Sequence, residues 1–342
     1  MKTTNAEIGA AGYFASGLQS PGEIRGAALG GYGVGVSCAK VQRGMLEALE
    51  EVAKIGARVF VDSGAFAEVE WDPAAGRLVD RKPLTDADWQ RRFSVYERLA
   101  ANIGGRALYL VAPDKVGDQL ETLARMVRYA PRVQAILQLR DSDPFFGPRL
   151  IVPVQRGGSS MGAFADQCLE ALGLGALDER VVYGVPSKKG ATALDELRAF
   201  AATRVPGSAF HLLGLGPQSP RFEQLIDAVL EACPGAVVTC DAVRITALVG
   251  RGGSKPRPLT AARDELLARE PGLEATEVKR RTILEVFGRE SVALLHDNGW
   301  RDPELHDADG TCYVAGSACP CTKKAPGFEA SRGGQHAAPA LP

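Results

Sequence analysis

Four polar side chains each close a short apolar run of the sequence. Asp62 ends RVFV, Asp114 ends ALYLVAP, Gln155 ends LIVPV and Asp241 ends AVVTC. One such Asp is more often only a helix N-cap, but four polar residues in the same position indicate a site. Two carboxylates facing one substrate suit substitution at an anomeric carbon, where one attacks as nucleophile and the other transfers protons.

The other candidate contacts suit a flat, polar ring. The amide of Gln155 offers both a donor and an acceptor. The backbone N–H groups of Gly184 and Gly214 can approach a ligand closely because no side chain intervenes. Together these groups favour a purine, although ordinary turn chemistry at the ends of strands explains each glycine equally well.

The elements that must position these residues alternate between two patterns. Short apolar, β-branched runs predict strands, and the amphipathic segments between them predict helices. The clearest strands are Arg58–Asp62, Ala107–Asp114, Leu150–Gln155, Val181–Val185, Ala209–Gly216 and Ala236–Asp241, with weaker candidates at Tyr13–Ser16 and Val34–Cys38. The helices are expected at Val41–Ile55, Ala87–Ile103, Gln119–Tyr129, Ala163–Leu172, Ala193–Ala202 and Arg221–Ala232.

Eight such units predict an α/β fold, a (β/α)8 TIM barrel. Strands that consist of continuous apolar runs are typical of parallel strands covered by helices. The eight units together span about 240 residues, which fits the typical barrel of about 250 residues. The alternative is a doubly wound open sheet, which a further strand at Val133–Leu139 would favour. In a barrel the active site lies at the carboxyl ends of the strands, so the polar residues that close them are expected to converge.

Composition excludes several classes of protein. Hydrophobic residues make up 45% and charged residues 24% of the 342 residues, as in globular proteins. The first twenty residues contain no apolar run long enough for a signal peptide, and no run in the chain is long enough for a membrane span. We therefore expect a cytoplasmic protein without a membrane partner. The 40 basic and 41 acidic residues give a net charge of −1, so any nucleic acid must be held by a local patch.

The pattern of the chain changes after Asp241. A basic loop rich in Gly and Pro, Gly250–Pro258, precedes a strongly helical segment, Glu274–Asp297. We therefore expect a barrel over residues 1–245, a basic loop with a small helical, Cys-containing extension over 246–324, and a disordered tail over 325–342. The candidate nucleic-acid-binding residues are Arg244, Arg251, Lys255, Arg257 and the run Lys279-Arg280-Arg281, which could equally be solvated or paired with neighbouring acids.

The motifs resemble those of the tRNA-guanine transglycosylase superfamily. Asp62-Ser63-Gly64-Ala65-Phe66 resembles its Asp-Ser-Gly-Gly-Phe, and Leu213-Gly214-Leu215-Gly216 resembles its Met-Gly-Val-Gly. The resemblance implies Asp62 as the proton-transferring carboxylate and Asp241 as the nucleophile. It also implies that Ser63, Gly64, Asp114, Gln155, Gly184 and Gly214 contact the base.

Within this superfamily the chain is most similar to the DNA-directed branch, the DpdA proteins. The Val-Ala-Pro-Asp-Lys strand end, the compact chain and the divergent segment Asp241-Ala242-Val243-Arg244 distinguish it from the tRNA branch. The resemblance implies replacement of guanine in DNA by a 7-deazaguanine base such as 7-cyano-7-deazaguanine. It implies no organic cofactor, and a homodimer or partner modification proteins are open alternatives.

A zinc site is a further implication of the resemblance. Cys319-Pro320-Cys321 reproduces the first pair of the family's Cys-X-Cys-X2-Cys…His site, but Lys324 stands where the third Cys belongs. Cys312 would supply a substitute thiolate, and His336 or His306 the imidazole, for four-coordinate structural zinc. The incomplete set indicates a zinc site or one that has lost a ligand.

Three other functions remain open at this point. The first is queuine-type exchange in tRNA. The second is a barrel that only binds a nucleoside or nucleic acid, in which case the carboxylates would be dispensable. The third is an unrelated barrel hydrolase or aldolase, which is disfavoured because no Lys closes a strand and no two His residues have metal-binding spacing.

Overall fold

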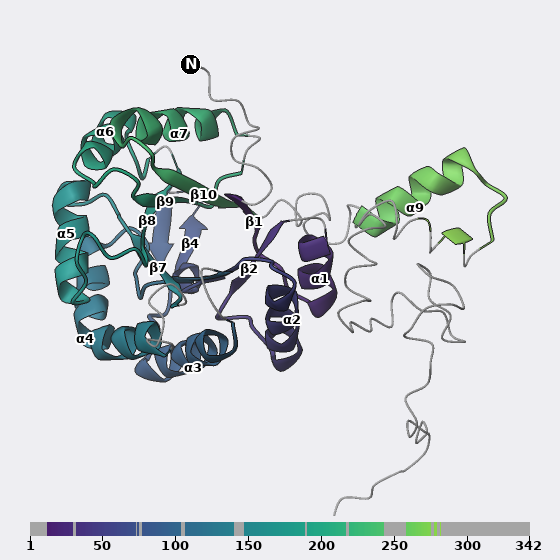
Figure 1. Ribbon diagram of the computed structural model, residues 1–342, viewed down its shortest axis with the longest axis horizontal. Helices are drawn as coiled ribbons and strands as arrows, with labels where there is room; N and C mark the ends of the chain where they lie inside the picture. Colours follow the sequence, from purple (N-terminus) through teal and green to yellow (C-terminus); the bar gives the residue numbers. More distant parts are fainter. Residues whose placement is uncertain are drawn as a thin grey trace, which may run out of the picture. The chain divides into compact units, whose positions relative to one another are not determined.

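Eight parallel strands close into a barrel in the computed structural model of the chain (Figure 1). The structure describes residues 12–242 apart from 30–31, 73, 75–76, 104–106, 140–146, 189 and 217–218, and residues 258–281 apart from 275–276 and 279–280. The barrel strands are β1 Tyr13–Ala15, β2 Gly33–Ser37, β3 Val59–Asp62, β6 Leu108–Val111, β7 Arg149–Pro153, β8 Val181–Pro186, β9 Ala209–Leu213 and β10 Val237–Ala242. Each strand pairs with the next barrel strand in the chain, and β10 pairs with β1, so the predicted barrel is confirmed and the open sheet is wrong.

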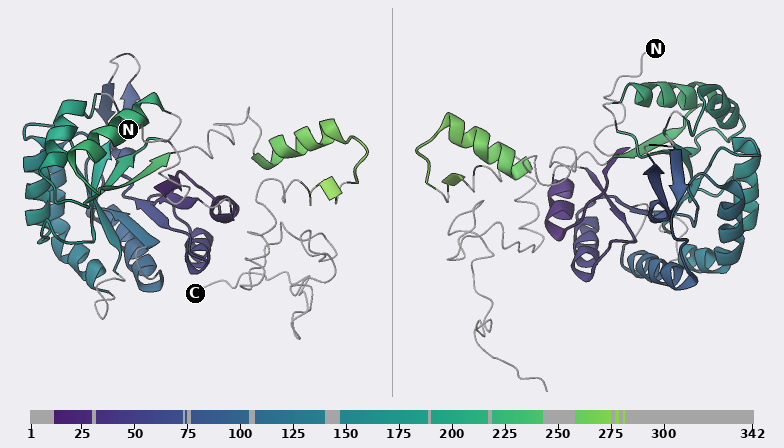
Figure 2. Two further views of the ribbon diagram at one scale, coloured as in Figure 1. Left: turned by 45° about the horizontal axis from the view of Figure 1, so that its top comes forward. Right: turned by 180° about the vertical axis from the view of Figure 1, so that it is seen from behind.

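Helices surround the strands on the outside of the barrel (Figures 1 and 2). They are α1 Pro21–Leu29, α2 Arg43–Lys54, α3 Asp86–Asn102, α4 Gln119–Gln138, α5 Met161–Ala171, α6 Leu194–Ala202 and α7 Pro220–Ala232. Side chains that accept hydrogen bonds from the first turn fix where several of them begin: Thr85 for α3, Asp118 for α4 and Ser160 for α5. The strand-to-helix loops therefore have defined ends, which keeps the residues that follow each strand in place.

Three uncertain segments of the sequence have clear outcomes. The weak strand candidates Tyr13–Ser16 and Val34–Cys38 are confirmed as β1 and β2. The possible strand Val133–Leu139 is wrong, because it forms the end of α4. Its buried residues Val133, Ile136 and Leu137 recur at the spacing of three and four that places side chains on one face of a helix.

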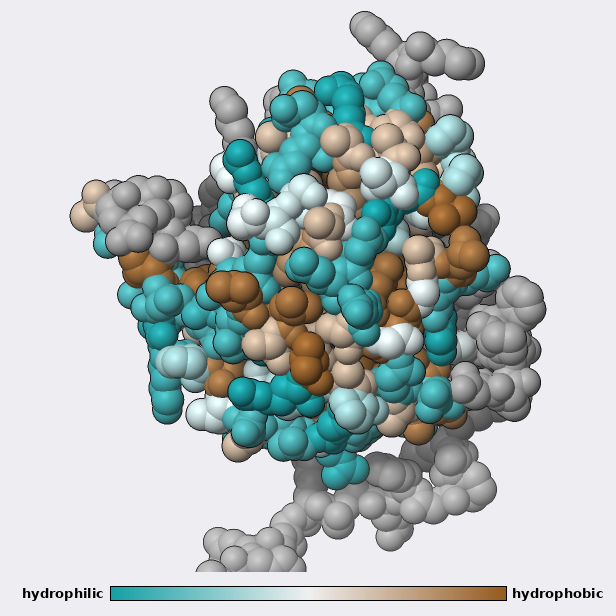
Figure 3. Space-filling model, turned by 90° about the vertical axis from the view of Figure 1, so that its left-hand side faces the viewer, coloured by the Kyte–Doolittle hydropathy of each residue, from teal (hydrophilic) through white to brown (hydrophobic). Residues whose placement is uncertain are grey.

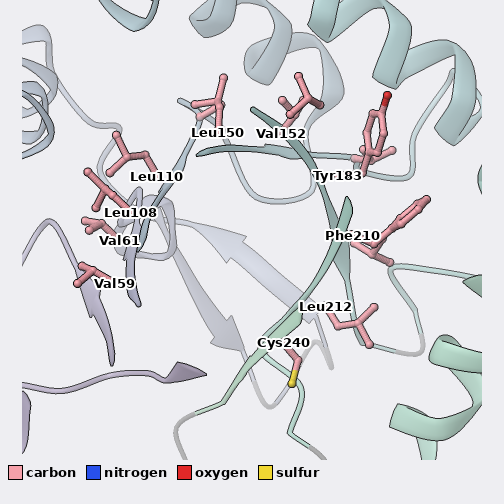
Figure 4. Packing of buried hydrophobic residues seen from close by; sticks show 14 of the residues in the cluster. Val59, Val61, Leu108, Leu110, Leu150, Val152, Tyr183, Phe210, Leu212 and Cys240 are labelled. Carbon is pink, nitrogen blue, oxygen red and sulfur yellow. The ribbon is translucent and has the colours of Figure 1, made fainter. Parts of the chain in front are cut away.

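The two faces of the barrel strands pack into two separate apolar clusters. Outward-facing residues such as Val59, Val61 and Leu110, labelled in Figure 4, belong to one cluster with buried residues of the surrounding helices. The inward-facing cluster contains Phe14, Phe60, Tyr109, Val111, Ile151 and Val182. The barrel is therefore filled by side chains below its mouth, and polar residues higher on the same inward faces are left at the mouth.

A two-stranded hairpin extends the connection from β3 to α3. Its strands, β4 Val69–Asp72 and β5 Arg77–Asp80, pair antiparallel and were not predicted. Lys115, which follows β6, forms an ion pair with Asp80 at 2.7 Å between Nζ and Oδ1. The hairpin is thereby tied to the loop that carries Asp114.

The chain divides into two compact units, Met1–Thr260 and Ala261–Pro342. An unpredicted helix, α9 Pro258–Arg269, begins where the sequence predicted the end of a loop. Within the second unit, Arg281 donates to Glu270 at 2.6 Å. The predicted boundaries at 245 and 324, most of the predicted helix Glu274–Asp297 and the predicted tail all lie outside the described residues.

The barrel surface mixes polar and apolar side chains. On the face that carries α5, Figure 3 shows hydrophobic residues interspersed with hydrophilic ones. Among the residues that the structure describes, no helix is both long and apolar enough to cross a bilayer.

Candidate functional site

Three carboxyl groups from separate strands lie at the carboxyl end of the barrel. Asp62 is the last residue of β3, Asp241 is the last but one of β10, and Asp114 lies three residues beyond the end of β6. Asp114 and Asp241 are 6% and 7% exposed, respectively. The strand that carries Asp114 ends earlier than predicted, at Val111, so this side chain is positioned by a loop.

The loop after β3 holds the Asp62 carboxylate. The N–H of Gly64 donates to Oδ2 of Asp62 at 3.0 Å. Gly64 has φ of 78° and its Cβ, if present, would lie 2.9 Å from that of Ala39, so a larger residue would strain this turn. Burial, followed by the negative charge of Asp241, raises the pKa of Asp62 to about 6, against the opposing effects of the Gly64 N–H and Arg92.

Asp114 and Ser63 form a second polar cluster beside Asp62. The Ser63 hydroxyl donates to Oδ1 of Asp114 at 2.6 Å. Burial raises the pKa of Asp114 to about 7; the Ser63 hydrogen bond opposes this rise and the charge of Asp62 adds to it. Both carboxyl groups therefore exchange protons close to neutral pH.

Gln155 joins this cluster, with its amide engaged inside the chain. Its Nε2 donates to the carbonyl of Lys115 at 2.8 Å and lies 3.5 Å from Oδ2 of Asp114. Its Oε1 accepts from the N–H of Gly117. Gln155 thus secures the loop that carries Asp114, and its direct contact with a ligand stays a prediction.

Asp241 is held through one of its two carboxylate oxygens. Oδ1 accepts from the N–H of Gly214 at 2.7 Å and lies 3.2 Å from Nε2 of His211. No described residue donates to Oδ2. The predicted ligand contact Gly214 is therefore brought to the site, where its N–H is directed at Asp241.

Gly184, the remaining predicted contact, lies within β8. A Cβ at this position would lie 2.8 Å from Cγ2 of Ile151 and 3.2 Å from Cδ1 of Leu213. Packing inside the barrel is thus sufficient to require glycine there. The predicted contact between Gly184 and a base is neither supported nor opposed by this packing.

Two buried basic side chains complete the site and were missed in the sequence. Nε of Arg92 in α3 donates to the carbonyl of Ser63 at 2.7 Å, and Arg92 forms no ion pair with a described acidic residue. Its position between Trp89 and Phe93 on the buried face of a predicted helix was the available signal. His211 occupies the inward face of β9, between the inward residues Ala209 and Leu213, where strand alternation alone could have placed it.

A buried ion pair supports the loops that carry Ser63 and Asp114. Nη2 of Arg125 donates to Oε1 of Glu68 at 2.8 Å, and Nη1 donates to the carbonyl of Asp114 at 2.6 Å. Oε1 of Glu68 also accepts from the N–H of Leu84 at 2.6 Å. Since Glu68 and Arg125 are 0% and 4% exposed, removing Arg125 would leave the buried Glu68 carboxylate without its ion pair, whereas Arg125 also pairs with Glu121 at 2.8 Å.

The remaining predicted residues lie outside the described part of the chain. These are the nucleic-acid candidates Arg244, Arg251, Lys255 and Arg257, and the zinc candidates Cys312, Cys319, Cys321 and His336. Among the residues that are described, no three His, Cys, Asp or Glu side chains are grouped to hold a metal ion. Both sets stay predictions.

Comparison with known proteins gives no family. No family model matches the chain, and no curated protein matches it. Two solved structures of D-allulose 3-epimerase from Methylomonas sp. are similar to it, one in complex with D-allulose and one with additional C-terminal residues. Each epimerase is 12% identical in sequence to this chain, with a TM-score of 0.39. Each match covers 67% of this chain, and the two matches cover 82% and 83% of the respective epimerase chains. At this level the similarity carries no conclusion about a reaction.

The raised pKa of Asp114 predicts a pH-dependent stability. Between the ordinary value of 3.8 and the folded value of about 7, the native state binds more protons than the unfolded state. The free energy of unfolding should therefore fall as pH rises through this range. Asp114→Asn should remove this loss, stabilising the protein by on the order of a few kcal/mol at about pH 8 and by little at about pH 4.

Urea unfolding of both proteins at the two pH values measures this effect. The control is Asp166→Asn, since Asp166 has a side chain that is 61% exposed and pairs with Arg204. The control should leave the pH dependence unchanged. Equal stability of wild type and Asp114→Asn at the higher pH would contradict the assignment.

Proposed function

We propose that this chain is an enzyme, a base-exchange transglycosylase that replaces guanine in DNA with a 7-deazaguanine base. The observation that carries the proposal is the electrostatic coupling of the three carboxyl groups at the barrel mouth. The charge of Asp241 raises the pKa of Asp62, and the charge of Asp62 raises that of Asp114. A mouth with one nucleophile and nearby proton-exchanging acids fits substitution at an anomeric carbon.

In the first half of the reaction, Oδ2 of Asp241 attacks C1′ of the target nucleotide. The bond from C1′ to N9 of guanine breaks as the bond from C1′ to Oδ2 forms, which leaves a covalent glycosyl-enzyme. Asp62 donates a proton to the departing guanine. Its pKa of about 6 keeps a usable fraction protonated near neutral pH.

In the second half, the incoming base reverses these steps. Asp62, now ionised, removes the proton from N9 of the 7-deazaguanine base. N9 then attacks C1′, and the bond to Oδ2 breaks to restore the Asp241 carboxylate. One proton-transferring carboxyl group, Asp62, and one nucleophile, Asp241, thus serve both halves.

The cluster around Asp114 suits the edge that the two bases share. An ionised carboxylate accepts from two adjacent donors, and guanine presents such donors at N1 and its exocyclic amine. Replacement of N7 by carbon leaves this edge unchanged, so one pocket can accept both bases. Phe66, which follows the Asp62 loop and is 55% exposed, offers an aromatic face on which a base can stack.

The choice of DNA rests on the resemblance of the motifs to the DNA-directed branch. Transfer RNA is the other polynucleotide compatible with the same chemistry. The test supplies duplex DNA and tRNA that contain isotopically labelled guanine, together with unlabelled 7-cyano-7-deazaguanine. We expect release of labelled guanine from DNA and a matching 7-deazaguanine nucleoside in its digest.

Each other result has a defined meaning. Release from tRNA alone would transfer the proposal to the tRNA branch. Release from neither polynucleotide, with a folded protein that binds both, would overturn base exchange in favour of a binding barrel.

The basic loop is expected to supply contacts to phosphates. Replacing Arg251, Lys255 and Arg257 together with Ser should weaken DNA binding and reduce the slope of log affinity against log salt. Each lost duplex contact lowers that slope by about 0.9, so the triple variant should lose about two to three units. Fluorescence anisotropy with a duplex at several salt concentrations measures it, and an unchanged slope in a folded variant would locate the binding surface elsewhere.

A further inference from the structure

His211 is a fully buried imidazole that the proposed steps do not use. It lies on β9 inside the barrel, and its ring stacks on Phe60 with a centroid distance of 4.9 Å and an interplanar angle of 23°. Phe14 lies beside it, at 5.8 Å between ring centroids. A polar ring among apolar neighbours is costly unless its nitrogens are hydrogen-bonded.

Both nitrogens of this ring have partners on the neighbouring strand. Nδ1 lies 2.8 Å from Oγ1 of Thr239, and Nε2 lies 3.2 Å from Oδ1 of Asp241. His211 pairs with Thr239 in the register of β9 and β10, and Asp241 follows two residues further along β10 on the same inward face. The ring is thus fixed by stacking on one side and by Thr239 at one nitrogen, with its other nitrogen directed at Asp241.

This arrangement makes the two oxygens of Asp241 unequal. Oδ1 receives the N–H of Gly214 and faces Nε2 of His211, whereas no described residue donates to Oδ2. An ionised carboxylate only accepts hydrogen bonds, so Nε2 bonds Oδ1 in the form of the ring that carries its proton there. In a neutral ring Nδ1 then accepts from the hydroxyl of Thr239, whose Oγ1 also lies 3.2 Å from the carbonyl of Phe210.

We infer that His211 is a positioning residue that holds Oδ1 of Asp241 through Nε2–H and thereby leaves Oδ2 as the attacking oxygen. The inference rests on the proposed base exchange, because it assigns a role in orienting that reaction's nucleophile. A misplaced nucleophile costs about a hundredfold in rate for a displacement of about 1 Å. The effect should therefore appear in the rate of the chemical step and not in the binding of the base.

Two substitutions separate positioning from packing. His211→Phe keeps a flat ring on Phe60 and removes the donor, while His211→Gln places an amide N–H near the former Nε2. We expect His211→Phe to lower kcat by about tenfold to a hundredfold, with KM for the incoming base within about twofold of wild type, and His211→Gln to recover most of kcat. Equal losses in both variants, or a larger KM with unchanged kcat, would overturn the inference.

Thr239→Val provides the matched test of the tether at Nδ1. It removes one hydroxyl with little change of shape and should lower kcat by a few-fold. In the His211→Phe background it should have no further effect on kcat, since residues that act through one hydrogen-bonded chain are not additive. Multiplicative losses of kcat would show that the two side chains act independently and would overturn the inference.

A spectroscopic test does not depend on activity. Nitrogen-15 NMR of the imidazole in wild-type protein reports which ring nitrogens carry protons, and Asp241→Asn, which replaces one carboxylate oxygen by a donor, should shift the Nε2 signal. Wild type that exchanges no base but shows a protonated, Asp241-sensitive Nε2 would refute the proposed function and leave the hydrogen bond standing. An Nε2 signal without a proton near neutral pH, or one insensitive to Asp241, would overturn the inference itself.

Discussion

Asp241→Ala is expected to abolish base exchange, with a loss of at least about 10⁴-fold in kcat. The substitution removes the oxygen that forms the bond to C1′, and the proposed steps give Asp62 the transfer of a proton and not the attack. Asp62 and Asp114, with pKa values raised to about 6 and about 7, are suited instead to exchanging protons near neutral pH. Labelled guanine released from DNA in a fixed time measures the loss.

Trapping the intermediate tests the same residue directly. Wild type incubated with DNA, without an incoming base, should form a protein–DNA adduct that survives denaturation and migrates separately in a gel. Asp241→Ala and the near-isosteric Asp241→Asn should form none. The exposed-acid control Asp166→Asn should form the adduct at the wild-type level, and an adduct that persists in Asp241→Ala would assign the nucleophile to another residue.

The barrel could be predicted from the sequence because its signals are local. Each strand is a short apolar run, and the predicted helices repeat buried positions at helical spacing, such as Met45, Leu49 and Val52 in α2. The hairpin of β4 and β5 was not predicted because each of its strands has only four residues, and two of the four are charged in each strand. Alternation over so few residues does not differ from that of a polar loop.

The acidic part of the site was predictable for a related reason. In a parallel barrel, a polar residue that closes a strand lies at the mouth whatever its neighbours are, which placed Asp62 and Asp241. The basic part depends on contacts between distant segments: Arg92 reaches the carbonyl of Ser63 from a helix, and His211 reaches Asp241 from the next strand. Neither partner can be identified without the register of the barrel.

Asp62→Asn is expected to preserve DNA binding and to slow formation of the glycosyl-enzyme by about 10²–10⁴-fold, the usual contribution of general acid–base catalysis. Asn is nearly isosteric with Asp, and its carbonyl oxygen can still accept the N–H of Gly64 that now bonds Oδ2. The loop and its neighbours Ser63 and Arg92 should therefore keep their positions. The substitution then removes mainly the ability of residue 62 to transfer a proton.

The pH dependence of this first half-reaction distinguishes a proton donor from a structural cap. Only protonated Asp62 can donate to guanine, and its pKa of about 6 means that the donor form declines as pH rises above that value. In single-turnover measurements at saturating DNA, the wild-type rate should fall by about tenfold per pH unit above about pH 7.

The rate of Asp62→Asn should be low and nearly independent of pH, while Asp114→Asn should weaken base binding and retain the wild-type decline of rate with pH. A decline that persists in Asp62→Asn, or a rate within a few-fold of wild type, would mean that Asp62 only caps its loop and that the proton comes from elsewhere.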